Sequence, residues 1–142
     1  MSQAHFWAWL FLFFFLINIL MLNTNKHHYV EKGWGHELWV TNSDKYCGKR
    51  LFILKDKKLS WHYHKLKDEV MFVQSGKIVI NFGYDEDETK SESITLSVGD
   101  SFHIPVGLIH RITGLEDSEI FEFSTQHFDE DSYRITPGDI LK

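Results

Sequence analysis

Three side chains that commonly bind metal ions, His62, His64 and Glu69, lie within eight residues of each other. Side chains alternate between the two faces of a β-strand. A strand through this segment therefore places both imidazoles on one face, about 7 Å apart along the chain. Glu69 opens the apolar run 70–73, which indicates a returning strand. The segment is thus predicted to be a hairpin of a small β-barrel that directs two histidines and one carboxylate at a divalent metal ion.

Short segments of apolar or alternating character must position this hairpin. Turn residues such as Gly76 separate them, and none has the length or the period of a helix. This spacing indicates an all-β barrel. Besides the hairpin, the predicted strands are 49–55, 78–82, 94–98, 101–104, 109–113 and 119–126, and residues 127–142 are predicted to be polar and irregular.

Two segments resemble the paired motifs of the cupin superfamily. The first reads His-x-His, four residues, Glu, six residues, Gly, from His62 to Gly76. The second reads Gly, five residues, Pro-x-Gly, two residues, His, from Gly99 to His110. Asp56 stands where the first motif usually opens with Gly, and Gly114 where the second usually closes with Asn.

The cupin resemblance implies a single-domain double-stranded β-helix, or jelly-roll barrel, that holds one divalent metal ion. Zinc is the preferred ion, with Mn, Co, Fe or Ni as alternatives. The implied ligands are His62, His64, Glu69 and His110.

From Tyr29 to about Arg134 the chain is similar to the cupin-type (type II) mannose-6-phosphate isomerases, which are often fused behind a sugar nucleotidyltransferase. It departs from them at His62, where they often carry Gln, and at 136–138, where Thr-Pro-Gly replaces an ending with Gly and Arg. The segments that carry the similarity are Trp34-Gly35, Lys49-Arg50-Leu51, Leu59-Ser60, 104–107, His110-Arg111, 119–122, 129–131 and Tyr133-Arg134.

The isomerase resemblance implies that mannose 6-phosphate and fructose 6-phosphate are interconverted through an enediolate, beside a metal that holds the developing charge. A base is needed there, and a phosphate needs cations. Strand alternation lets only one of Lys49 and Arg50 face the pocket, and it turns Arg111 away from the metal unless a bulge intervenes. The predicted catalytic residues are Glu122, His103 and Lys49, and the predicted substrate-binding residues are Arg50, Arg111 and Arg134.

Two other classes of function fit the same motifs. An iron(II)-dependent dioxygenase uses three histidines and a carboxylate with open coordination positions. A non-catalytic sugar-binding or accessory cupin binds a ligand without turnover. Every alternative takes a small-molecule ligand, with a sugar phosphate expected.

Composition limits the partners and the compartment. The 142 residues predict one domain, and a net charge of −5 excludes the basic surface that nucleic-acid binding requires. The one cysteine, Cys47, excludes an internal disulfide and fits a cytoplasmic, reducing compartment. Exposed strand edges would favour a homodimer. The predicted division is an apolar segment at 1–22, a cupin barrel at 29–135 and a polar tail at 136–142.

The run from Phe6 to Leu22 is apolar except for Asn18. It lacks the flanks of a cleaved signal peptide. It is interpreted as a mis-assigned extension with translation starting at Met21, as a tail, or as a membrane anchor. As an anchor, it would place the domain in the cytoplasm, because Lys26 and Lys32 follow it.

Overall fold

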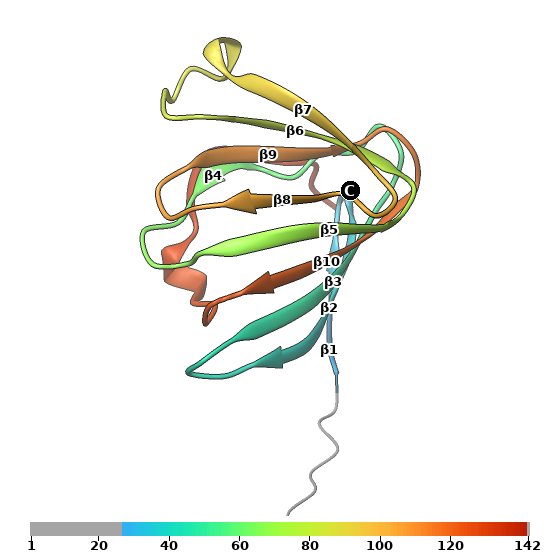
Figure 1. The fold of residues 1–142 in the computed structure, drawn as a ribbon, viewed down its shortest axis with the longest axis vertical. Coiled ribbons are helices and arrows are strands. Elements are labelled where there is room, and N and C mark those ends of the chain that lie inside the picture. Colours follow the sequence, from blue (N-terminus) through green and yellow to red (C-terminus); the bar gives the residue numbers. More distant parts are fainter. Residues whose placement is uncertain (1–26, 142) are drawn as a thin grey trace, which may run out of the picture.

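Two antiparallel sheets face each other and enclose the interior of a barrel (Figure 1). The computed structural model describes residues 27–141, so the predictions for 1–22 lie outside these residues. The first sheet contains, in spatial order, β1 (His28–Lys32), β2 (Gly35–Asn42), β3 (Cys47–Ile53), β10 (Ser118–Ser124), β5 (Glu69–Ser75) and β8 (Ser101–Ile104). The second contains β11 (Tyr133–Thr136), β4 (Trp61–Tyr63), β9 (Ile109–Gly114), β6 (Lys77–Gly83) and β7 (Glu92–Ser97).

The connections are short. Two single-turn 3-10 helices, η1 (Glu88–Lys90) and η2 (Asp129–Asp131), are the helical segments found in residues 27–141. Within that range no helix has the length and apolar character needed to cross a membrane. The predicted all-β jelly-roll fold is therefore confirmed.

Alternation along the strands builds the core. In β3 the residues at odd positions, from Cys47 to Ile53, are buried, whereas those at even positions are half-buried. Ile53, Val73, Ile78 and Ile120 are all fully buried, and they come from four strands in the two sheets. Burial of such side chains contributes about 1.5–3 kcal/mol each, so the facing sheets hold each other in place.

The predicted hairpin between His62 and Glu69 is wrong. Strand β4 pairs with β9 and β11 in one sheet, whereas β5 pairs with β8 and β10 in the other. The intervening residues therefore cross from sheet to sheet. Asp131 holds this crossing, because its buried carboxylate accepts hydrogen bonds from the backbone N–H groups of Lys65, Leu66 and Lys67.

The carboxyl-terminal segment is also more ordered than predicted. Residues 133–136 form β11, which pairs with β4 and so lies beside the predicted metal-binding histidines. Arg134 is the register partner of His62 in this ladder. Alternation over four residues is too short a pattern to predict such a strand.

Asp56 has a φ of 60°, in the left-handed region. Glycine enters this region without strain, and aspartate tolerates it better than most residues. The backbone conformation thus explains why a motif that usually opens with glycine can open with aspartate in this chain.

Candidate metal centre

Three histidines come together inside the barrel. Strand β4 supplies His62, the residue after it supplies His64, and β9 supplies His110. His62 and His110 are register partners on adjacent antiparallel strands, so their side chains point to the same face. One ring nitrogen from each imidazole lies within 4.8 Å of the others. This spacing allows all three to bind one ion.

Backbone carbonyl groups orient the three imidazoles. Each histidine has its Nδ1 atom within hydrogen-bond distance of a carbonyl oxygen, which can only accept, so Nδ1–H donates. This arrangement leaves each Nε2 with a free lone pair, the form that binds metal ions. The accepting carbonyls are those of Ser60 for His62 (3.0 Å), Asp131 for His64 (2.8 Å) and Leu108 for His110 (3.1 Å).

Glu69 approaches the histidines from the opposite sheet. Its Oε1 atom lies 3.2 Å from His110 Nε2 and 3.6 Å from His64 Nε2. Within residues 27–141, neither Glu69 Oε1 nor His64 Nε2 has a hydrogen-bond partner, although both are buried. Facing acceptors of this kind repel each other unless a cation lies between them. The residues therefore fit a divalent metal ion.

Burial keeps His62 and His64 neutral. Loss of solvent and, to a lesser extent, the nearby Lys67 lower the pKa of His64 to about 4, against the opposing effect of Glu69. Loss of solvent, reinforced by His110, holds the pKa of His62 well below its usual value. Neutral imidazole binds a metal without first losing a proton, so the site is ready for an ion at neutral pH.

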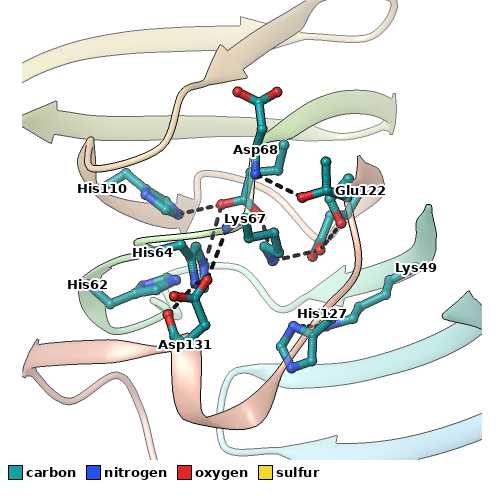
Figure 2. A network of polar contacts seen from close by, with 12 residues as sticks. Lys49, His62, His64, Lys67, Asp68, His110, Glu122, His127 and Asp131 are labelled. Carbon is teal, nitrogen blue, oxygen red and sulfur yellow. Dashed lines mark hydrogen bonds and ion pairs between the residues drawn. The ribbon is translucent and has the colours of Figure 1, made fainter. Parts of the chain in front are cut away.

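Lys67 joins the site to a second buried carboxylate. Its Nζ atom lies 2.6 Å from Glu69 Oε2 and 2.7 Å from Glu122 Oε1 (Figure 2). Burial alone would lower the pKa of Lys67, but Glu122 and Glu69 outweigh it and raise the pKa. Burial would raise the pKa of both glutamates, yet Lys67 holds each below its ordinary value. The three groups therefore stay charged around neutral pH.

Lys49 and Glu122 face the same cavity from β3 and β10. Lys49 is 3% exposed, and its Nζ atom lies 3.1 Å from His127 Nδ1 and 4.0 Å from the centre of the Trp39 ring. The three imidazoles of the candidate metal centre, from His62, His64 and His110, lie on one side of the view in Figure 2, and Lys49 and His127 lie on the other. The cavity between them has a volume of about 270 Å³, close to the lower end of small-molecule pockets, about 300–1,000 Å³.

Three predicted site residues lie away from this cavity, which corrects the predictions for Arg50, Arg111 and His103. Strand alternation turns all three side chains to the outer faces of the sheets, and no bulge reverses it at these positions. Arg50 and Arg111 form ion pairs there, with Glu119 (3.6 Å) and Glu88 (2.9 Å), and His103 Nε2 lies within hydrogen-bond distance of Asp68 (3.0 Å). Of the predicted substrate-binding residues, exposed Arg134 alone lines the cavity.

Four residues of the site were not predicted. Lys67 lies in the polar connection before β5, where a lysine is usually solvated, so its sequence position gave no signal. Asp131 stood in an acidic segment with no sign that its carboxylate would be buried. Glu37 and His127 line the cavity from distant segments, and no spacing in the sequence connects them to the histidines.

Comparison with solved structures gives the same architecture. CapF, the capsular polysaccharide assembling protein of Staphylococcus aureus, superposes with a TM-score of 0.67 at 23% identity, over 78% of this chain and 34% of CapF. KdgF of Halomonas sp. superposes with a TM-score of 0.60 at 18% identity, over 75% of this chain and 90% of KdgF. Oxalate decarboxylase of Bacillus subtilis superposes with a TM-score of 0.65 at 19% identity, over 77% of this chain and 30% of the decarboxylase.

The chain thus spans about a third of the CapF and oxalate decarboxylase chains. No curated protein matches it. A family model described as Cupin matches residues 58–136, which is more than half of the sequence. These residues include the three histidines, Glu69, Lys67 and Glu122. The chain belongs to the cupin family.

Proposed function

We propose that this cupin is a metal-dependent enzyme that moves a proton on a small, oxygen-rich substrate. The specific reaction that we propose is the interconversion of mannose 6-phosphate and fructose 6-phosphate. The observation that carries the proposal is the buried Glu122 carboxylate, which lines the same cavity as the three-histidine group. A base beside a metal site is what an aldose–ketose isomerisation needs.

The metal would be held by His62, His64 and His110, with Glu69 Oε1 facing the same point. A divalent ion, when bound, polarises the oxygens next to the carbon that loses its proton. His62 and His64 need no deprotonation to hold it, because burial keeps both of them neutral.

Glu122 is proposed to accept the proton from one carbon and return it to the next. Lys67 lowers the pKa of Glu122, so the carboxylate is ionised and free to accept at neutral pH. A low pKa also makes the carboxylate a weak base, so the transfer depends on acidification of the carbon-bound proton by the polarised substrate oxygens. Lys49, on the same side of the cavity, is proposed to stabilise the negative charge that develops on a substrate oxygen.

Arg134 is proposed to meet the substrate phosphate. It is exposed, it lines the mouth of the cavity, and its register partner is His62. A phosphate at the mouth would leave the carbonyl end of the sugar deeper in the barrel. The fold that this chain has in common with CapF, a capsular polysaccharide assembling protein, supports a carbohydrate substrate.

The test is a coupled assay of fructose 6-phosphate formed from mannose 6-phosphate, with the full chain loaded separately with Zn, Mn, Co or Fe(II). We expect metal-dependent turnover that a chelator abolishes. Absence of turnover with every metal, while the metal remains bound, would reject the reaction.

A second function, binding of a sugar ligand without turnover, is favoured by one observation. Arg50 and Arg111 form ion pairs outside the cavity, which leaves fewer cations for a phosphate than the isomerase resemblance implies. Calorimetric titration with mannose 6-phosphate and with mannose separates the two functions. Binding of both sugars with equal affinity, and turnover of neither, would support the accessory function.

A further inference from the structure

Lys67 is placed where its charge affects both the metal site and the proposed base. Its side chain is 4% exposed, and its two carboxylate partners, Glu69 and Glu122, are 1% and 5% exposed. Removing three charged groups from water costs more than most ion pairs return, so such a cluster is weak evidence for stability. A role in the chemistry of the site is the better explanation.

The two oxygens of Glu69 have different surroundings. Oε2 lies 2.6 Å from Lys67 Nζ, whereas Oε1 faces the Nε2 atoms of His64 and His110. Carboxylates bind cations through one oxygen or through both. With Lys67 on Oε2, Oε1 is the oxygen left for an ion at the histidines.

We propose that Lys67 is a positioning residue that restricts Glu69 to one metal-binding oxygen. This inference rests on the proposed metal-dependent function. Three imidazoles and one carboxylate oxygen supply four donors, and a second carboxylate oxygen would take a position that substrate oxygens need. Lys67 thus keeps the metal open to substrate, and its positive charge reduces the affinity for the ion.

The experiment uses the full chain loaded with Co(II), whose visible absorption bands report its coordination. The variants are Lys67→Met, which frees both oxygens of Glu69, and Lys67→Met/Glu122→Gln. The double variant removes one charge of each sign and leaves Glu69 as the one carboxylate of the former cluster of three, so it tests the inference even if the single variant does not fold. Thermal unfolding followed by circular dichroism identifies the folded variants.

The matched control is Lys65→Met. Lys65 is exposed, with its Nζ atom 4.3 Å from the centre of the Tyr133 ring, and it carries the same charge two residues away. We expect both Lys67 variants to shift the Co(II) bands and to lower the Kd for Co(II) about tenfold, the scale of changes beside metal ligands. The Lys65 control is expected to keep the spectrum and the Kd.

Introducing the Lys67 change into a Glu69→Gln background shows whether it acts through Glu69. We expect a clearly smaller gain in affinity there. An unchanged spectrum in both Lys67 variants, or an equal gain with and without the Glu69 carboxylate, would overturn the inference and leave the metal site standing. Failure of the unsubstituted chain to bind Co(II), Zn or Mn would instead reject the proposed metal-dependent function.

Discussion

The two ends of the barrel interior contain opposite kinds of side chain on the same strands. Along β10 the inward residues change from Ile120 to Glu122, and along β5 they change from Val73 to Glu69. Along β9, His110 and Ile112 follow the same pattern. One end packs apolar side chains against each other, and the other gathers charged groups and imidazoles around a cavity. A rigid apolar end supports a polar end that could not stabilise itself.

The comparison predicts that a substitution at the polar end removes the metal without unfolding the chain, and that a substitution at the apolar end does the opposite. These two substitutions should give the largest effects. We expect His64→Ala to lower the bound metal from about one ion per chain to less than about a tenth, and to abolish turnover, while the chain remains folded. Ile120→Ala should do the reverse. It should lower the free energy of unfolding by about 2–5 kcal/mol and leave metal content unchanged. Elemental analysis and denaturant unfolding measure both quantities, and full metal content in His64→Ala would remove the distinction.

Glu122→Gln sharpens the comparison inside the polar end. It removes the proposed base but keeps the shape of the side chain and leaves Lys67 paired with Glu69. We expect kcat to fall by about 100- to 10,000-fold, the contribution of a general base, with unchanged metal content. A kcat within about twofold of the original would show that another group moves the proton.

Acid should lower the free energy of unfolding of the metal-free chain, because histidines at the polar end take up protons on unfolding. The pKa of His64 is about 4 in the fold, and that of His62 is also far below its ordinary value of 6.5. Between pH 6.5 and about 4.5, these histidines bind protons in the unfolded chain but not in the folded one. The free energy of unfolding should therefore fall on acidification, by up to about 1.4 kcal/mol per pH unit for each histidine.

Two details sharpen this pH prediction. Below pH 4 the folded chain also protonates His64, so the contribution of that residue stops growing. Glu69 and Glu122 have lowered pKa values, so their contribution is lost only below about pH 4.5 and does not obscure the histidines. Denaturant unfolding of chelator-treated protein at several pH values measures the slope. The slope of the free energy of unfolding against pH should be smaller for His64→Ala. Equal slopes for this variant and the original chain would show that His64 does not cause the acid sensitivity.

The smallest effects are expected on the outer faces. His103→Ala and Arg50→Ala remove polar contacts on the outer faces, where even an ion pair typically contributes only about 0–1 kcal/mol. Turnover should stay within about twofold of the original in both variants. A tenfold loss in either would mean that the outer residue takes part in the reaction.

The sequence predicted the fold, and the grouping of the three histidines, because the signals for both are local. Spacing alone placed His62 and His64 on one face, and the cupin motifs added His110. The spacing gave a wrong partner strand for Glu69. Glu69 comes five residues after His64, and a connection of this length can close a hairpin or cross between sheets. The crossing depends on the carboxylate of Asp131, which lies more than sixty residues along the chain from the backbone groups that it binds.

Alternation in strands also explains which of the residues proposed to contact the substrate could be predicted. It correctly required that only one of Lys49 and Arg50 face the cavity, but it could not say which face was inside. Lys67 shows a further limit. A lysine in a polar connection is usually solvated, and only the two glutamates that it contacts explain its burial.

The most direct test of a metal-dependent polar end is an anomalous difference map from crystals of the chain grown with zinc. We predict one strong peak, bounded by the Nε2 atoms of His62, His64 and His110 and by one oxygen of Glu69. A map without a peak among these atoms, at a zinc concentration that saturates binding in solution, would contradict the account.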